Sequence, residues 1–111
     1  MTEIRTVSST GGEKGQKPER VDLVPPEIIL ALSRHFAVGA EKYDDHNFRR
    51  GYPWSLSYAA AQRHLLAFWG GEDIDPETGT PHVIAAMWHC GAMYLFMREH
   101  PDFDDRYRAE S

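Results

Sequence analysis

The segment from Arg63 to His89 constrains the fold of this chain more than any other part of it. An apolar stretch with helical spacing ends at Gly70-Gly71, and a second such stretch starts after Thr80-Pro81. Glycine is common just past a helix and proline is common in its first turn, so the segment predicts two helices around one loop. A helical hairpin of this kind brings side chains of the loop and of both helices together.

Histidines and carboxylates are concentrated in this hairpin. His64 falls on the apolar stripe of the first helix, and His82 and His89 fall two turns apart on the apolar face of the second. The loop between them adds four acids, which are Glu72, Asp73, Asp75 and Glu77. Grouped imidazoles and carboxylates bind divalent metals, and such metals serve phosphate chemistry. The alternative is that the histidines are hydrogen-bonded core residues, the commoner role of a single inward-facing histidine.

Helical geometry limits which of these groups can share one ion. His64 lies about two turns before the loop and His89 two turns after His82, so we expect His64 and His89 to face each other at one depth. His82 and the loop acids are expected nearer the mouth. A mixed imidazole and carboxylate set favours Mg²⁺ or Mn²⁺, with Zn²⁺ less favoured, and the chain has no cysteine pair for a structural zinc.

Three helices are predicted in all. The first runs from Pro26 to Tyr43, the second is capped by Ser55 and ends at Gly70-Gly71, and the third ends near His100, before Pro101. No strand pattern is evident, so the fold class is all-α, a small bundle of three main helices. Three helices bury little surface, and we therefore expect self-association into a homodimer or tetramer to complete the bundle.

The ends of the chain differ in composition from its centre. Residues 1–19 are polar, include basic side chains and predict a flexible arm. Residues 20–101 are the predicted helical domain, and residues 102–111 are a charged tail that is expected to fray. Basic residues of the arm are candidates to close over a ligand. The plainer alternative, a disordered tail without function, is favoured for the arm.

Charge and hydropathy exclude some partners. The net charge of -5 argues against duplex nucleic acid, but not against one nucleotide held through a cation. No apolar run reaches membrane-spanning length and no signal-peptide core is present, so no membrane partner is expected. Cys90 is the only cysteine, is expected in the core, and permits no intramolecular disulfide, which suits a reducing cytoplasm.

The loop 44–53 mixes acids, bases and aromatic side chains beyond what a plain connection needs. Asn47 and Arg49 are candidates to recognise a base edge or a phosphate, and Phe48 and Trp54 to stack on a nucleobase. Just before the loop, Glu41 is a candidate metal ligand or general base, with Lys42 beside it. The alternatives are a solvated loop, core aromatic residues and a surface charge pair.

The central sequence resembles a phage family, the dATP/dGTP diphosphohydrolase N-terminal domain, which is related to the MazG-like all-α nucleoside triphosphate pyrophosphohydrolases. The resemblance covers about residues 13–97. It rests on five segments, which are Gly15-Gln16-Lys17-Pro18-Glu19-Arg20, Gly39-Ala40-Glu41-Lys42-Tyr43, His46-Asn47-Phe48-Arg49-Arg50-Gly51, Arg63-His64-Leu65, and Gly71-Glu72-Asp73-Ile74-Asp75-Pro76-Glu77-Thr78-Gly79 with His82.

This resemblance implies metal-dependent cleavage of purine (deoxy)nucleoside triphosphates, dATP and dGTP, to a monophosphate and pyrophosphate in the host cytoplasm. The metal would be held by some of the family's recurrent polar positions, and Glu41 or Glu72 would take the proton of the attacking water. The purine would lie against Phe48 and Trp54. The implied metal ligands are Glu41, His64, Glu72, Asp75 and His82, and the implied basic substrate contacts are Lys14, Lys17 and Arg20. His89 is not part of the pattern.

The chain departs from MazG-like enzymes in its acidic pairs. Those enzymes carry Glu-x-x-Glu on one helix and Glu-x-x-Asp on the next, whereas Val38 precedes Glu41 by three residues, and Glu72 and Asp75 fall in a loop. The metal site is therefore either built with histidines or lost. If it is lost, the alternative function is non-catalytic: a phage protein that binds or sequesters a nucleotide or a cyclic nucleotide. A third hypothesis is an interaction protein with core histidines.

Overall fold

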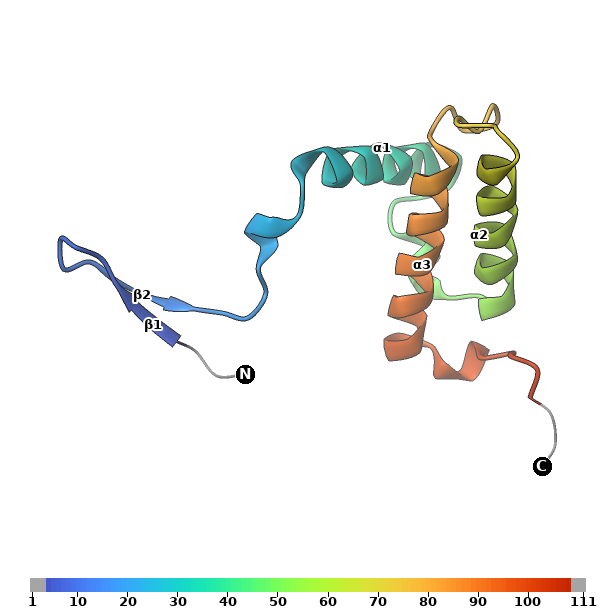
Figure 1. Ribbon diagram of the computed structural model, residues 1–111. Helices are drawn as coiled ribbons and strands as arrows, with labels where there is room; N and C mark the ends of the chain where they lie inside the picture. Colours follow the sequence, from blue (N-terminus) through green and yellow to red (C-terminus); the bar gives the residue numbers. More distant parts are fainter. Residues whose placement is uncertain (1–3, 109–111) are drawn as a thin grey trace.

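The helical hairpin predicted from the sequence forms the centre of the molecule. In the computed structural model, which describes residues 4–108, α2 (Trp54–Trp69) and α3 (His82–Glu99) lie side by side and antiparallel (Figure 1). The first helix, α1 (Pro26–Lys42), runs across one end of this pair and packs on α3. Short 3₁₀ helices occupy the connections, namely η1 (Val21–Leu23), η2 (Asn47–Arg50) and η3 (Pro101–Phe103).

The prediction of a purely all-α chain is wrong at the N-terminus. Strand β1 (Ile4–Val7) pairs antiparallel with β2 (Glu13–Gln16), with Ile4 opposite Gln16 and Val7 opposite Glu13. The turn is closed by Gly11 at a φ of 87° and by the Ser8 hydroxyl, which accepts the N–H of Gly12 at 3.0 Å. Neither strand alternates apolar and polar residues over a buried face, so the pattern that identifies strands is absent.

This β-hairpin projects away from the helices (Figure 1). The radius of gyration is 18.6 Å, compared with about 13 Å for a compact domain of this length. The arm predicted for residues 1–19 therefore contains a β-hairpin, and this hairpin does not lie over the helical body. Residues 17–25, which we call the stalk, join it to α1.

The core lies where the start of α2 packs against the end of α3. Trp54, Ala92 and Phe96 are buried there, and the aromatic rings of four half-buried residues pack around them, which are Phe48, Tyr52, Trp88 and Phe103. The indole N–H of Trp54 donates to the carbonyl of His100 at 3.1 Å. A buried indole with its N–H satisfied is a structural arrangement, and Trp54 here takes the core role that the sequence left open.

Helix α2 starts two residues earlier than expected, with Pro53 in place of Ser55 just before it, and is capped differently. It begins at Trp54 after Pro53, and no side chain of the preceding residue caps it. Asp105 of the C-terminal segment takes that role instead: it accepts the N–H of Ser55 at 2.9 Å and also the Ser55 hydroxyl proton. The segment through residue 105 is thus bound to the helical body, where the sequence predicted fraying.

Cys90 lies exposed on α3, against the expectation that it belongs to the core. Among residues 4–108, no helix combines the length and the apolar character needed to cross a membrane.

Candidate functional site

Three predicted ligands meet where the hairpin loop closes. His64 of α2, Asp75 of the loop and His82 at the start of α3 each offer one donor atom, and these atoms lie within 4.8 Å of one another. The two Nδ1 atoms of His64 and His82 are 2.9 Å apart, and Oδ2 of Asp75 is 3.9 Å from Nδ1 of His64. Asp75 and His82 are only 8% and 5% exposed. We call these residues the histidine–aspartate cluster.

The loop that carries Asp75 is held rigidly by its own hydrogen bonds. Oδ1 of Asp75 accepts the N–H of Glu77 at 2.9 Å, and its carbonyl accepts the N–H of Gly79 at 2.7 Å. Gly79 has a φ of 76°, a conformation that glycine adopts at little cost. The N–H of His82 donates to the carbonyl of Asp73 at 3.0 Å, which ties the start of α3 to the same loop.

Glu72 lies on the far side of the His82 ring. Its Oε1 is 2.7 Å from Nε2 of His82, while Nδ1 of the same ring faces His64. A carboxylate at Nε2 favours the tautomer that carries its proton there, which leaves the Nδ1 lone pair directed into the cluster. In this structure Glu72 therefore contacts His82 from outside and does not itself belong to the cluster.

His35 of α1 joins the loop from the other side and was not identified from the sequence. Its Nδ1 is 2.7 Å from the hydroxyl of Thr80, which in turn lies 2.8 Å from the hydroxyl of Thr78. Thr78 then donates to Oδ2 of Asp75 at 3.4 Å. The only available signal was spacing, because His35 falls between Leu32 and Phe36 on the apolar face of its helix.

His89 is part of a second series of side-chain hydrogen bonds, farther from the hairpin loop than the cluster. Its Nδ1 is 2.9 Å from the hydroxyl of Ser57, and Ser57 is 2.5 Å from the hydroxyl of Tyr52. The His89 ring stacks on His64 with 5.9 Å between centroids. The expected pairing of His64 with His89 is thus present as a ring contact, while His64 also reaches up to His82, nearer the loop than helical rise suggested.

Burial favours the neutral form of three of these imidazoles, those of His89, His64 and His35. It lowers the pKa of His89 to about 4, with nearby His64 as a second cause, and it also lowers the pKa of His64 and His35. Neutral imidazoles present lone pairs near pH 7, which is the form that binds metals. Two of the separations, 2.9 Å between the His64 and His82 Nδ1 atoms and 3.9 Å between His64 Nδ1 and Asp75 Oδ2, are close to those of ligands around one octahedral ion, about 3 Å for adjacent and about 4 Å for opposite positions.

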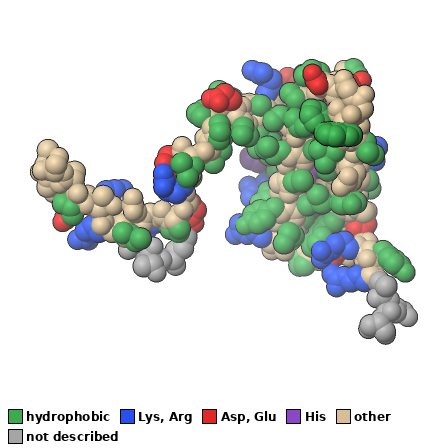
Figure 2. Space-filling view, viewed as in Figure 1, with side chains coloured by type: hydrophobic (Ala, Val, Ile, Leu, Met, Phe, Trp, Pro, Cys, Tyr) green, Lys and Arg blue, Asp and Glu red, His purple; other side chains and the backbone are tan. Residues whose placement is uncertain are grey.

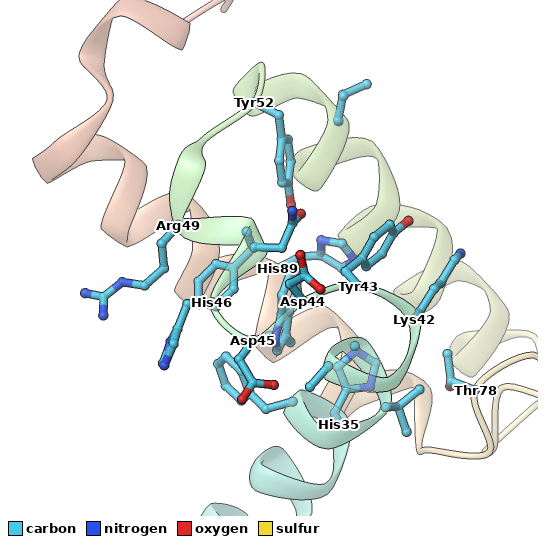
Figure 3. Close-up of a pocket in the computed structure, with 18 of the residues that line it drawn as sticks. His35, Lys42, Tyr43, Asp44, Asp45, His46, Arg49, Tyr52, Thr78 and His89 are labelled. Carbon is cyan, nitrogen blue, oxygen red and sulfur yellow. The ribbon is translucent and has the colours of Figure 1, made fainter.

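A cavity of about 1000 Å³ opens beside the cluster (Figure 3). The end of α1, the loop that follows it and η2 form one side, and α2, α3 and the 75–78 loop form the other. The rings of Phe48 and Trp88 meet edge-on at 5.3 Å in its wall. Its charged lining residues are four acids and two bases, namely Asp44, Asp45, Asp75, Glu77, Lys42 and Arg49.

Several predicted substrate residues line this cavity, and others do not. Lys42, Asn47, Phe48 and Arg49 line it, although Arg49 points away from the centre in Figure 3 and pairs with Glu99 at 3.6 Å. Trp54 lies in the core instead.

The remaining predicted residues lie outside the cavity in this structure. Among residues 4–108, Glu41 is exposed and is absent from both the cavity lining and the histidine–aspartate cluster. Lys14 and Lys17 lie at the projecting β-hairpin, and Arg20 pairs with Asp22 at 2.8 Å at the start of the stalk. The structure thus brings His64, Asp75 and His82 together, with Glu72 touching the group.

Comparison with known proteins adds one family and one relative. Residues 8–106 match the family described as dATP/dGTP diphosphohydrolase, N-terminal. A protein of Salmonella phage PMBT28 named dATP/dGTP diphosphohydrolase is 31% identical over 96 residues, which are 85% of this chain and 31% of that protein. The chain thus spans about a third of the length of this relative. No solved structure is significantly similar to this chain.

Proposed function

This chain belongs to the dATP/dGTP diphosphohydrolase N-terminal family, and from that membership and the site geometry we propose that it hydrolyses purine (deoxy)nucleoside triphosphates to a monophosphate and pyrophosphate. The observation that carries the proposal is the histidine–aspartate cluster in the wall of a cavity of about 1000 Å³. Cavities of this size hold ligands as large as a nucleotide. The proposed cofactor is a divalent metal at His64, Asp75 and His82.

The charge of the cavity supports metal dependence. Four carboxylates and two basic side chains line it, and burial favours the neutral form of His64 and His89 in its wall, so a triphosphate entering alone meets net repulsion. Two imidazoles and one carboxylate suit Mn²⁺ better than Mg²⁺, with Zn²⁺ as the alternative. A bound metal ion would supply charge neutralisation of the phosphates and a more acidic water.

Other side chains would contact the phosphates, the base and the attacking water. Lys42 lines the cavity and would pair with a phosphate, while Asn47 would hydrogen-bond the base edge. The exposed face of the Phe48 ring would lie against the purine. Glu72 would hold His82 in its tautomer and is one candidate to accept the proton of water. Glu41, the other candidate, would have to move toward the cavity. Lys14, Lys17 and Arg20 would have to move toward the cavity to neutralise pyrophosphate.

The test is product formation from a panel of dNTPs with Mg²⁺, Mn²⁺, Zn²⁺ or a chelator. We expect pyrophosphate release from dATP and dGTP with Mn²⁺, and loss of about 100-fold or more in His82→Ala and Asp75→Asn. Gln62→Ala, an exposed change on α2 outside the cavity lining, is the matched control. Full activity in both cluster variants would show that the site is elsewhere.

One observation favours a second function. Glu41, the acid that the family pattern places in the site, does not line the cavity among the described residues. If no acid serves as proton acceptor, the same cavity would bind or sequester a nucleotide, or a cyclic nucleotide, without cleaving it. Tight binding of dATP in calorimetry with no product under any metal would establish this alternative and exclude the hydrolase.

A further inference from the structure

We propose that the exposed face of the α2–α3 hairpin is the surface on which a second copy of this chain docks, with the two copies related by a two-fold axis near Cys90. The starting observation is that α3 carries no Lys, Arg, Asp or Glu from His82 to Met97. A helix that is apolar all round fits a position covered on every side. In one chain, however, α1 and α2 cover only part of α3.

The uncovered residues form a regular stripe. Val83, Met87, Cys90, Tyr94 and Met97 are all exposed, with Tyr94 and Met97 at 55% and 61%. Their spacing alternates between four and three residues, which is the spacing of a seam that packs against another helix. The stripe is about 21 Å long, and a seam of this length and regularity matches a helix better than a small molecule.

The order of residues along the stripe is suited to packing on itself. Reversal about Cys90 places Val83 opposite Met97 and brings Met87 within one residue of Tyr94, so apolar side chains meet apolar side chains. In a two-fold interface the same patch serves both copies, and the residue at the axis meets its own counterpart. Cys90 and Gly91 are small residues at this centre, where they allow the two helices to approach closely.

Helix α2 extends the same face. Tyr58 of α2 and Met97 of α3 line one hollow of about 600 Å³, so their surfaces are continuous there. Leu65 and Trp69 follow Tyr58 on the same side of α2 by helical phase, and both are exposed, Trp69 at 86%. Figure 2 shows hydrophobic side chains spread over the helical body, with charged side chains mostly at its margins. Such a two-helix face offers the width that one stripe lacks for a stable interface.

Docking on this face leaves the proposed active site open. Trp88 and Leu95 line the large cavity and lie on the opposite side of α3 from Cys90. Association and turnover are therefore separable, and failure of the hydrolase proposal leaves this one unaffected. Two hairpins packed in this way form four antiparallel helices, a common solution for small helical chains.

The test uses the one cysteine of the unaltered chain. We expect a short bismaleimide to link two copies through Cys90 in solution, because the two thiols lie near the axis. The matched control moves the cysteine to an exposed apolar position of α1, in the double substitution Cys90→Ser, Leu30→Cys, and should give little linked product. Linking that is no stronger through Cys90 than through the control would overturn the proposal.

Sedimentation equilibrium gives the second measurement. The unaltered chain should sediment as a dimer or a higher even assembly in the micromolar range, and Met87→Lys, Tyr94→Lys should weaken association at least 100-fold. Leu30→Lys should leave it unchanged. Circular dichroism confirms that each variant keeps its helices. A single-chain mass for the unaltered protein, or association that survives the double lysine substitution in a folded protein, would show that this face is not the interface.

Discussion

At the scale of single residues, the two ring nitrogens of His82 have different partners. Nε2 faces the Glu72 carboxylate and Nδ1 faces His64. Among Glu72 and the three cluster residues, Glu72 has the most exposed side chain, and it contacts His82, which has the most buried one. This arrangement is a common support of metal-binding histidines. Glu72 thus contacts His82 and lies outside the cluster, a distinction that the sequence pattern, which suggested direct ligation, did not make.

We predict that Glu72→Gln weakens Mn²⁺ binding by about 10-fold to 100-fold, because a neutral amide holds the required His82 tautomer less strongly. Calorimetric titration of the metal measures this change. Asp73→Asn is the control, because only the backbone carbonyl of Asp73 contacts His82. Equal affinity in Glu72→Gln and the unaltered chain would remove the positioning role.

His89 makes stability depend on pH in a defined direction. Its pKa falls from 6.5 to about 4 on folding because the ring is buried, so the unfolded chain binds a proton that the folded chain excludes. The stability is full above pH 6.5 and decreases as the pH falls toward 4, by at most about 3 kcal/mol. The lowered pKa values of His35 and His64 act in the same direction.

We therefore predict that His89→Asn flattens the dependence of the free energy of unfolding on pH between 6.5 and 4. Urea unfolding in the presence of a chelator measures it without a contribution from metal. Asparagine keeps a polar atom near Ser57 but does not titrate. His46→Asn, at an exposed loop position, should leave the slope unaltered. A slope retained in His89→Asn would place the titrating group elsewhere.

At the scale of elements, the loop between α2 and α3 decides whether the cluster forms. Asp75 has a fixed position because its main chain and side chain accept hydrogen bonds from Gly79 and Glu77. The backbone at Gly79 has the left-handed φ that closes this turn. The helices alone bring His64 and His82 together, and the turn adds the carboxylate.

We predict that Gly79→Ala destabilises the protein by about 1 kcal/mol, because an alanine methyl group disfavours the left-handed conformation. It should also weaken metal binding, since Asp75 is displaced. Gly39→Ala is the contrasting variant: it lies within α1 with no atom within 4 Å of the added methyl, and should stabilise by about 0.5–1 kcal/mol. Urea midpoints and metal titrations measure both. Equal effects of the two substitutions would show that the turn is not restrictive.

At the scale of the whole molecule, the N-terminal β-hairpin is separate from the helices. The main contacts of β1 and β2 are with each other, and the hairpin extends away from the cavity (Figure 1). Lys14, Lys17 and Arg20 would therefore reach the proposed nucleotide site only if the stalk bends or from a neighbouring copy. The exposed apolar residues of the stalk, Val21, Leu23 and Val24, are available for such a contact.

We predict that replacing Lys14, Lys17 and Arg20 together by alanine leaves thermal unfolding almost unchanged, because these residues do not support the core. The dissociation constant for dATP should rise roughly 10-fold, since three charge pairs of about 0.5 kcal/mol each would be lost. Differential scanning calorimetry and nucleotide titration test the two statements. An unchanged dissociation constant would confine the substrate contacts to the cavity.

The sequence by itself determined the three helices and the groups that the hairpin carries. Pro26, Gly70 and Pro101 mark helix ends through steric and hydrogen-bonding effects that act within a few residues, and the structure places the ends there. Helical phase likewise predicted that His64 and His82 lie on the inward faces of their helices. The family pattern selected five candidate ligands, and the structure places three of them, His64, Asp75 and His82, side by side.

Only the tertiary structure decided which distant side chains meet. His35 reaches Thr80 across 45 residues, Asp105 caps α2 from the far end of the chain, and Trp54 is buried in the core and does not lie at the cavity. These outcomes depend on how α1 crosses the hairpin, which is set by packing between separate elements. Local spacing carries information about a helix face, and it carries none about the element that will cover that face.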